Sequence, residues 1–208
     1  MSKRLKAIFL TVLALAASRS FGSIDTVDGI DWWFEVQNGS AVIKSTMSTQ
    51  TSAIDPNTVG AITVPSMLGG YPVTTIGPNA FYRCTKLNSV SVPAGVTSIG
   101  SSAFSGCSSL ESVSLPNSVT ALGNSAFYSC GKLRECELPA SVRTIGNSAF
   151  YACSSMSNVV FSGRIESIGS EAFRACSAVA EVSYLKTVGA IGSYAFLDCS
   201  SLTNVVFE

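Results

Sequence analysis

Histidine is absent from this 208-residue chain, and charged residues make up only 12% of it. Without histidine, the sequence lacks the commonest general base of enzymes and the commonest metal ligand. The 13 basic residues form no cluster or stripe, which argues against a nucleic-acid partner. Hydrophobic residues reach 47%, so the chain has enough apolar material for one substantial core and too little charge for a disordered protein.

The first 22 residues have the layout of a secretory signal peptide. Lys3, Arg4 and Lys6 precede an apolar run over residues 7–17, and small residues follow. The run is shorter than the about 20 residues that a membrane-spanning helix needs, so we expect no transmembrane segment. The alternative is a buried first helix, but the run shows no amphipathic period.

We expect cleavage before Ser23, and no cysteine lies near that point for lipid attachment. Nine of the 13 basic residues then remain against 13 acidic ones, a net charge of −4. The sequence therefore predicts a mildly acidic protein that is secreted or held at the cell surface.

A short pattern, Ile-Gly-x-x-Ala-Phe, recurs every 23 residues in six copies that begin at 76, 99, 122, 145, 168 and 191, with leucine in place of isoleucine at 122. A fixed period of about 20 to 30 residues predicts a solenoid, in which stacked coils together bury the core that one coil cannot bury alone. The phenylalanines of the pattern form one apolar column: Phe81, Phe104, Phe127, Phe150, Phe173 and Phe196.

Two further apolar columns lie two residues apart in each repeat, which is the spacing of a strand with one inward face. They predict short parallel strands at 89–92, 112–115 and 135–138, forming one sheet on one side of the solenoid. A proline follows each of these three segments and ends it. We expect short helical or irregular returns opposite this sheet, and a backbone turn at the glycine of each pattern.

The unit IGxxAFxxCxxLxxVxLP resembles the BspA-type leucine-rich repeat, found in secreted and surface proteins of bacteria and some protists. The resemblance covers roughly residues 61–208, with a first irregular coil at 61–75 and six regular repeats from residue 76. It implies an α/β repeat solenoid of the leucine-rich-repeat type. The family is associated with adhesion and protein binding, and no motif residue carries an activity.

Residues 23–60 lie outside the repeat and are expected to cap the solenoid. The segment 31–45 alternates about an Asn38-Gly39 pair, which predicts a β-hairpin. Trp33 would point outward, where its ring could stack on a sugar or pack within the cap. The residues expected to face the core are Trp32, Phe34 and Val36.

Six of the seven cysteines share the 23-residue period, and Cys136 stands alone in a column of valines. An exported chain with several cysteines first indicates disulfides. Stacked strands, however, lie about 4.8 Å apart, whereas the Cβ atoms of a disulfide lie about 3.8 Å apart. We therefore predict buried, reduced thiols that fill space. The column comprises Cys84, Cys107, Cys130, Cys153, Cys176 and Cys199.

The sequence offers little support for an enzyme. Ser129 and Lys132, and likewise Ser183 and Lys186, match the S-x-x-K pattern of some serine acylases. That chemistry needs both side chains on one helical face together with companion groups, and both pairs fall inside repeats. The cysteine spacing does not fit a closed tetrahedral metal site, and no phosphate or calcium loop occurs. We expect no catalytic site, cofactor or metal.

The outward residues of the strands are the first candidates for a binding surface, the alternative being that they are only solvated. Three glutamates among them would favour a basic patch on a partner. A second candidate is an aromatic set that could contact a ligand or pack between coils: Trp33, Tyr82, Tyr128 and Tyr151. The strand-face candidates are Ser112, Ser114, Glu135, Glu137, Asn158, Val160, Glu181 and Ser183.

Three functions remain open from the sequence. The first is a secreted or surface interaction module that binds a protein partner or adhesion receptor. The second is a carbohydrate-binding protein that uses its exposed aromatics on a glycan. The third is a structural spacer within a larger surface protein. The strand at the last residues, 203–208, is expected to leave an edge that pairs with further repeats or another chain.

Overall fold

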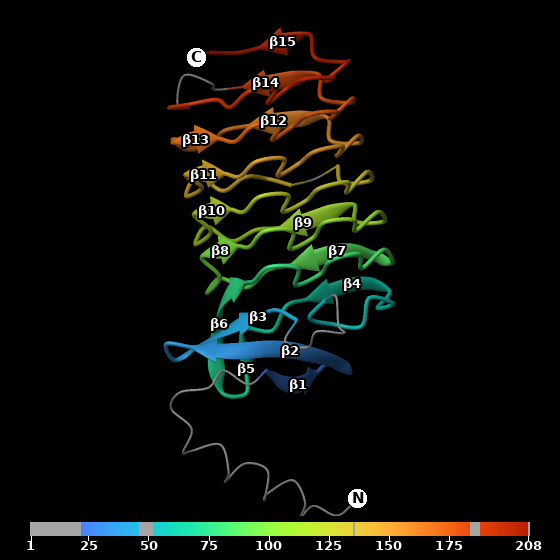
Figure 1. The fold of residues 1–208 in the computed structure, drawn as a ribbon, viewed down its shortest axis with the longest axis vertical. Helices are drawn as coiled ribbons and strands as arrows, with labels where there is room; N and C mark the ends of the chain where they lie inside the picture. Colours follow the sequence, from blue (N-terminus) through green and yellow to red (C-terminus); the bar gives the residue numbers. More distant parts are fainter. Residues whose placement is uncertain (1–21, 46–51, 135, 184–187, 208) are drawn as a thin grey trace, which may run out of the picture.

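A computed structural model describes residues 22–45, 52–134, 136–183 and 188–207. They form one stack of coils, with β1–β3 at one end and β15 at the other (Figure 1). The cap and first coil contain β1 (Ser23–Val27), β2 (Ile30–Gln37), β3 (Ser40–Ile43), β4 (Gly60–Thr63), β5 (Met67–Leu68) and β6 (Tyr71–Ile76). The repeats contain β7 (Leu87–Ser91), β8 (Ser98–Ile99), β9 (Ser112–Ser114), β10 (Ala121–Leu122), β11 (Thr144–Ile145), β12 (Asn158–Val160), β13 (Ser167–Ile168), β14 (Glu181–Ser183) and β15 (Asn204–Val205).

The described residues contain strands and turns but no helix, so the α/β part of the predicted fold class is not confirmed. The returns that follow each Ile-Gly pair are turns. Two positions in each return adopt a left-handed backbone conformation, as at Ser148 (φ 52°) and Ala152 (φ 56°). An α-helix cannot pass through such residues, because its right-handed backbone needs negative φ throughout.

Two parallel ladders run along the stack. Strands are confirmed at 89–91 and 112–114, but the strands on this side form two sheets, β4–β7–β9 and β12–β14–β15, rather than the one sheet that was expected. The second ladder joins β6, β8, β10, β11 and β13, which end at the Ile or Leu before the glycine of each pattern, and continues into the cap through β3. It was not predicted, because strands of two residues are too short to show an alternating pattern.

The glycines of the Ile-Gly pairs serve close approach between coils rather than a turn. A Cβ atom on Gly146 would lie 2.5 Å from the main-chain nitrogen of Asn124 and 2.6 Å from the carbonyl carbon of Gly123. A Cβ on Gly123 would likewise lie 2.6 Å from the nitrogen of Ser101. Neither glycine has a positive φ, so neither is needed for the turn that was expected. Glycine is needed here because any side chain would collide with the preceding coil.

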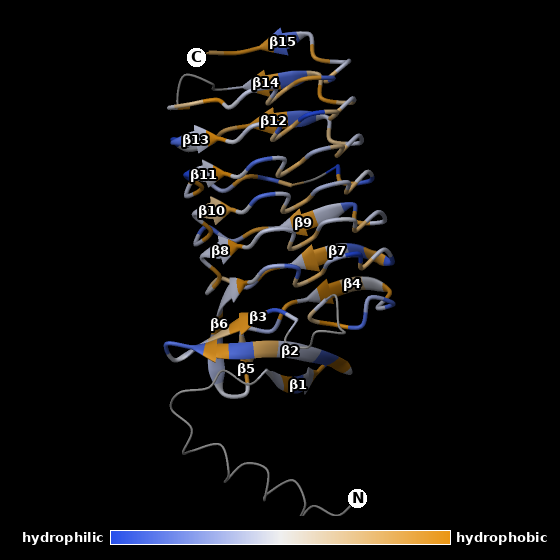
Figure 2. Ribbon diagram, viewed as in Figure 1, coloured by the Kyte–Doolittle hydropathy of each residue, from blue (hydrophilic) through white to orange (hydrophobic). Residues whose placement is uncertain are grey.

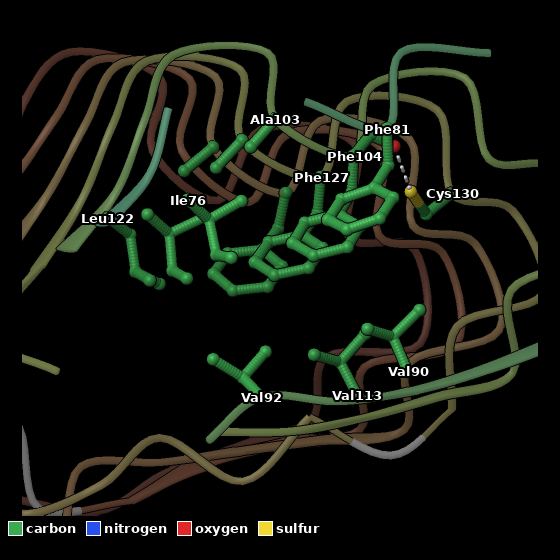
Figure 3. Close-up of a cluster of buried hydrophobic side chains, with 14 of the residues drawn as sticks. Ile76, Phe81, Val90, Val92, Ala103, Phe104, Val113, Leu122, Phe127 and Cys130 are labelled. Carbon is green, nitrogen blue, oxygen red and sulfur yellow. Dashed lines mark hydrogen bonds between the residues drawn. The ribbon is translucent and has the colours of Figure 1, made fainter. Parts of the chain in front are cut away.

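The phenylalanine column forms the axis of the core. Successive rings lie parallel, with centroids 4.8 Å apart for Phe81 and Phe104 and 5.3 Å apart for Phe173 and Phe196. Figure 3 shows the first three rings in a row, with Ile76 and Leu122 on one side and Val90 and Val113 on the other. Hydrophobic residues recur at equivalent places from coil to coil (Figure 2).

No disulfide joins the column cysteines, all of which lie among the described residues, and these side chains do more than fill space. The thiol of Cys130 donates a hydrogen bond to the main-chain carbonyl of Phe104, at 3.1 Å (Figure 3). The same bond joins Cys107 to Phe81 and recurs through Cys153, Cys176 and Cys199. Burial raises the pKa of the Cys130 thiol to about 12, so the proton that makes this bond is retained.

The N-terminal cap contains the predicted hairpin. β2 and β3 pair about Asn38 and Gly39, which both have positive φ, as the predicted two-residue turn requires. β3 then pairs with β6, so the cap continues the Ile-Gly ladder. Trp32 is buried, as expected, and meets Phe81 edge-on with ring centroids 6.1 Å apart. Phe34 is also buried, whereas Val36 is only partly buried.

Candidate functional site

The strand ladder that carries the candidate surface is interrupted in the coil that begins at Leu122. Arg134 and Cys136–Leu138 form no strand, although an ECEL strand was predicted over 135–138. Consequently β9 and β12 are end strands of two separate sheets in the described part of the chain. A cysteine stands where other coils place valine, and it is flanked by two glutamates, a residue type that is depleted in strands.

A groove of about 970 Å³ lies over this interruption. Its walls include Ser89 and Ser91 of β7 and the outward residues of β9 and β12. Between them, Cys136 and Leu138 also reach the groove, although both belong to columns that face the core elsewhere. The groove therefore lies between the two sheets, at the coil whose segment Cys136–Leu138 does not form a strand.

Five of the strand-face candidates line this groove: Ser112, Ser114, Glu137, Asn158 and Val160. The hydroxyl of Ser112 donates to that of Ser89 at 3.0 Å, so neighbouring coils share a ladder of serine hydroxyls. Glu135 lies outside the described residues. Sequence reasoning found the outward residues but missed the groove, whose only signal was Cys136 in the valine column.

Glu181 and Ser183 do not line the groove. Ser183 is only 6% exposed, in contrast to its expected outward position. Its hydroxyl donates to the Glu181 carboxylate, which also accepts from the Asn204 amide at 2.9 Å. These two hydrogen bonds lower the pKa of Glu181 and bind its oxygens to the protein's own side chains.

The tyrosines of the aromatic set each have a neighbouring side chain over the ring. Tyr128 and Tyr151 stack on each other at 4.8 Å, and the Arg174 guanidinium lies over Tyr151 at 5.7 Å. Arg174 is in turn paired with Glu171 and Asp198 at 2.7 and 3.4 Å. Tyr82 has Arg83 over its ring at 5.3 Å. These contacts place the tyrosines in packing between coils, while Tyr128 remains 37% exposed.

Trp33 is partly buried and packs against the core cluster, as the packing alternative expected. Its main-chain N–H donates to Ala53 at 2.8 Å, and its carbonyl accepts from Lys44 at 3.2 Å. The residue is therefore a fixed part of the cap.

The S-x-x-K pairs lack the helical face that acylases need. Ser129 and Lys132 lie in turns, and Ser129 has a φ of 56°. Lys186, the partner of Ser183 in the second pair, lies outside the described residues. Within the described ranges, no group of three or more Asp, Glu or Cys side chains could hold a metal ion, and no helix is long and apolar enough to span a membrane.

The last described coil exposes apolar side chains. Val205 is 41% exposed and Phe207 65% exposed, at the end strand β15. Pairing of this edge with further repeats or another chain remains a prediction.

The chain is similar to bacterial leucine-rich repeat proteins of known structure. A leucine-rich repeat protein of T. pallidum matches with a TM-score of 0.73 and 28% identity, over 90% of this chain and 80% of that one. A leucine-rich cell surface protein of Faecalibacterium prausnitzii matches with a TM-score of 0.59 and 25% identity, over 92% of this chain and 56% of that one. A leucine-rich repeat protein of Bacteroides ovatus shares the fold at 24% identity and a TM-score of 0.60, with 87% of this chain and 52% of that one covered.

This chain thus spans about half the length of the second and third relatives. No curated protein matches the sequence. The profile of the BspA type Leucine rich repeat region matches residues 74–203 in six copies, the same copies that build the two ladders and the phenylalanine column. The chain belongs to the BspA-type leucine-rich repeat family.

Proposed function

We propose that this protein is a secreted or surface-exposed interaction module that binds a protein partner in the groove between β9 and β12. The observation that carries the proposal is the coincidence of the groove with the outward strand residues. Inward positions are fixed by packing from coil to coil, whereas the outward ones change from serine to glutamate to asparagine and valine. Variable side chains that line one concavity can specify a partner.

The groove chemistry favours a protein over a glycan. Its described walls carry hydroxyl, amide, guanidinium and carboxylate groups but no aromatic ring on which a sugar could stack. Arg134 and Glu137 offset each other in the groove, so the preference for a partner with basic groups comes from the net charge of −4 of the mature chain. Association would then weaken as salt is added.

Export is part of the proposal. The leader over residues 1–22 has the layout of a signal peptide, and Ser23, the expected first residue of the mature chain, begins β1. The F. prausnitzii relative is described as a cell surface protein. These observations support a role outside the cytoplasm.

Binding arrays distinguish a protein ligand, a glycan ligand and a spacer without ligand. The mature protein is applied to an array of extracellular protein domains and to a glycan array. In parallel, the Ser114→Arg variant blocks the groove, and the Ser108→Arg variant places the same change on an exposed turn of the same coil. We expect signals on protein domains that Ser114→Arg loses and Ser108→Arg keeps.

Three outcomes contradict the proposal. Signals only on glycans would favour the carbohydrate alternative. Signals that both variants retain would place the binding surface elsewhere on the solenoid. Absence of signal on both arrays would favour the structural spacer.

A further inference from the structure

The two strand edges that border the groove leave main-chain groups without a strand partner. In the described part of the chain, β9 pairs only with β7 and β12 pairs only with β14. An unpaired edge presents a row of N–H and C=O groups that can template another strand. Most proteins cover or blunt such edges, and here two of them border one concavity.

The hydrogen bonds of β12 show which of its groups face the groove. Phe161 donates its N–H to Ser183 at 3.4 Å, and Ser157 accepts from Ala180 at 2.9 Å, so both residues face β14. The main-chain groups of successive residues point to opposite sides of a strand. Those of Asn158 and Val160 therefore point away from β14, toward the interruption.

The β9 edge has a matching arrangement. The carbonyl of Ser114 accepts from Val92 at 3.0 Å and thus faces β7. The main-chain groups of Val113 then point to the other side, toward the interruption. Both edges border the groove: Val113 and Ser114 line it from β9, and Asn158 and Val160 line it from β12.

We propose that the groove binds its partner by strand addition, with an extended polypeptide segment pairing through its main chain with the β12 edge at Asn158 and Val160. This inference rests on the proposed function and specifies its binding mode. An amphipathic helix would need a predominantly apolar groove, whereas hydroxyl and amide side chains alternate with apolar ones in this lining, beside a free strand edge. Main-chain pairing supplies the affinity in such complexes, and side-chain pockets supply the selectivity.

The test uses linear dodecapeptides selected from a random phage-displayed library on the mature protein. The tightest peptide is synthesised with one N-methyl group at each position in turn. Strand addition predicts that methylation weakens binding at least tenfold at alternate positions, whose N–H groups point to β12, and little at the positions between. Uniform tolerance, or losses without a two-residue period, overturns the inference.

Two variants test the protein side. Val160→Pro removes an N–H that faces the groove and keeps the bonds to β14, so peptide affinity should fall at least tenfold. Val160→Ala changes the side chain but keeps the N–H, so affinity should stay within about threefold. Equal behaviour of the two variants overturns the inference, and the N-methyl series decides the matter even if Val160→Pro fails to fold.

The outcomes separate the two proposals. If folded domains bind in the groove but no linear peptide is selected, strand addition is wrong and the proposed function stands. If neither binds, both are wrong.

Discussion

The thiol of Cys130 donates a hydrogen bond to the main-chain carbonyl of Phe104, one coil earlier in the stack. The same carbonyl accepts the main-chain N–H of Cys107 at 3.2 Å. Each column cysteine from Cys107 onward thus binds the main-chain carbonyl of the phenylalanine one coil earlier. These thiol bonds link the coils alongside the stacked rings.

Replacing Cys130 by alanine should lower the free energy of unfolding by about 2 kcal/mol, because the change removes a buried hydrogen bond and leaves a small cavity. Urea unfolding followed by circular dichroism measures the loss. Ser108→Ala serves as the control, since Ser108 is exposed on a turn and should change stability by less than about 0.5 kcal/mol. If both variants lowered the free energy of unfolding equally, the thiol hydrogen bonds would not contribute to stability.

Stability should fall at alkaline pH. Burial raises the pKa of the Cys130 and Cys176 thiols from 9.0 to about 12. The unfolded chain then releases these protons first, so the stabilising contribution is complete below pH 9 and is lost as the pH rises toward 12. Unfolding measured at intervals from pH 7 to pH 11 should show this decline, and Cys130→Ala should show a shallower one. A variant with the same slope as the parent would contradict the assignment.

The column thiols should also be reduced in the exported protein. A raised pKa keeps the thiolate, the nucleophile of disulfide exchange, scarce at neutral pH. Thiol counting under denaturing, non-reducing conditions should find most of the column cysteines free. Fewer than about two free thiols per chain would mean that the stacking distance between coils does not prevent disulfide formation.

Gly146→Ala should lower the free energy of unfolding by about 2 to 3 kcal/mol, because the new Cβ would overlap the preceding coil. The matched control is Gly131→Ala, whose Cβ would lie 3.6 Å from the nearest atom, the hydroxyl of Ser154. That variant should remain within about 0.5 kcal/mol of the parent. Thermal unfolding compares the two, and similar midpoints would contradict the steric explanation.

Ala152→Gly should raise the free energy of unfolding by about 0.5 kcal/mol. Ala152 has a φ of 56°, where a Cβ is costly, and relief of that cost exceeds the added entropy of glycine in the unfolded chain. Gly106 occupies the equivalent place two repeats earlier, with a φ of 76°. The reverse change, Gly106→Ala, should be destabilising by about 1 kcal/mol. Urea unfolding should show changes in the free energy of unfolding that have opposite signs in the two variants. Changes of the same sign would contradict the prediction.

Secreted material should begin at Ser23. Arg4 and Lys6, the apolar run and the small residue Gly22 meet the requirements of a cleaved leader. N-terminal sequencing of protein from the culture medium checks this. An intact Met1 on exported protein would contradict cleavage.

The sequence predicted those parts of the fold that repeat. A period of 23 residues placed Phe81 and its equivalents in one column, and the alternation at 89–92 and 112–115 located β7 and β9. The Asn38-Gly39 pair predicted the β2–β3 hairpin, and the same reasoning applied to Asp28-Gly29 would have found the β1–β2 turn.

The parts that depart from the repeat could not be predicted in the same way. The Ile-Gly ladder has strands of two residues, and its glycines are needed by a neighbouring coil that the local sequence does not reveal. The groove depends on the absence of a strand at Cys136–Leu138. The repeat pattern predicts a strand there, because Cys136 and Leu138 are apolar residues at the same repeat positions as the inward residues of the other strands. The contact that covers Tyr151 depends on where Arg174 lies, one coil further on.

The interrupted strand ladder also has a mechanical consequence. Between β9 and β12 the coils are joined by the Ile-Gly ladder, the turn hydrogen bonds, the rings and the thiols, whereas other neighbouring coils of the described residues also have a second set of strand bonds. Under tension applied along the stack, the protein should therefore separate at this junction first. The groove lies at the junction, so force would open the groove before it unfolds the coils on either side.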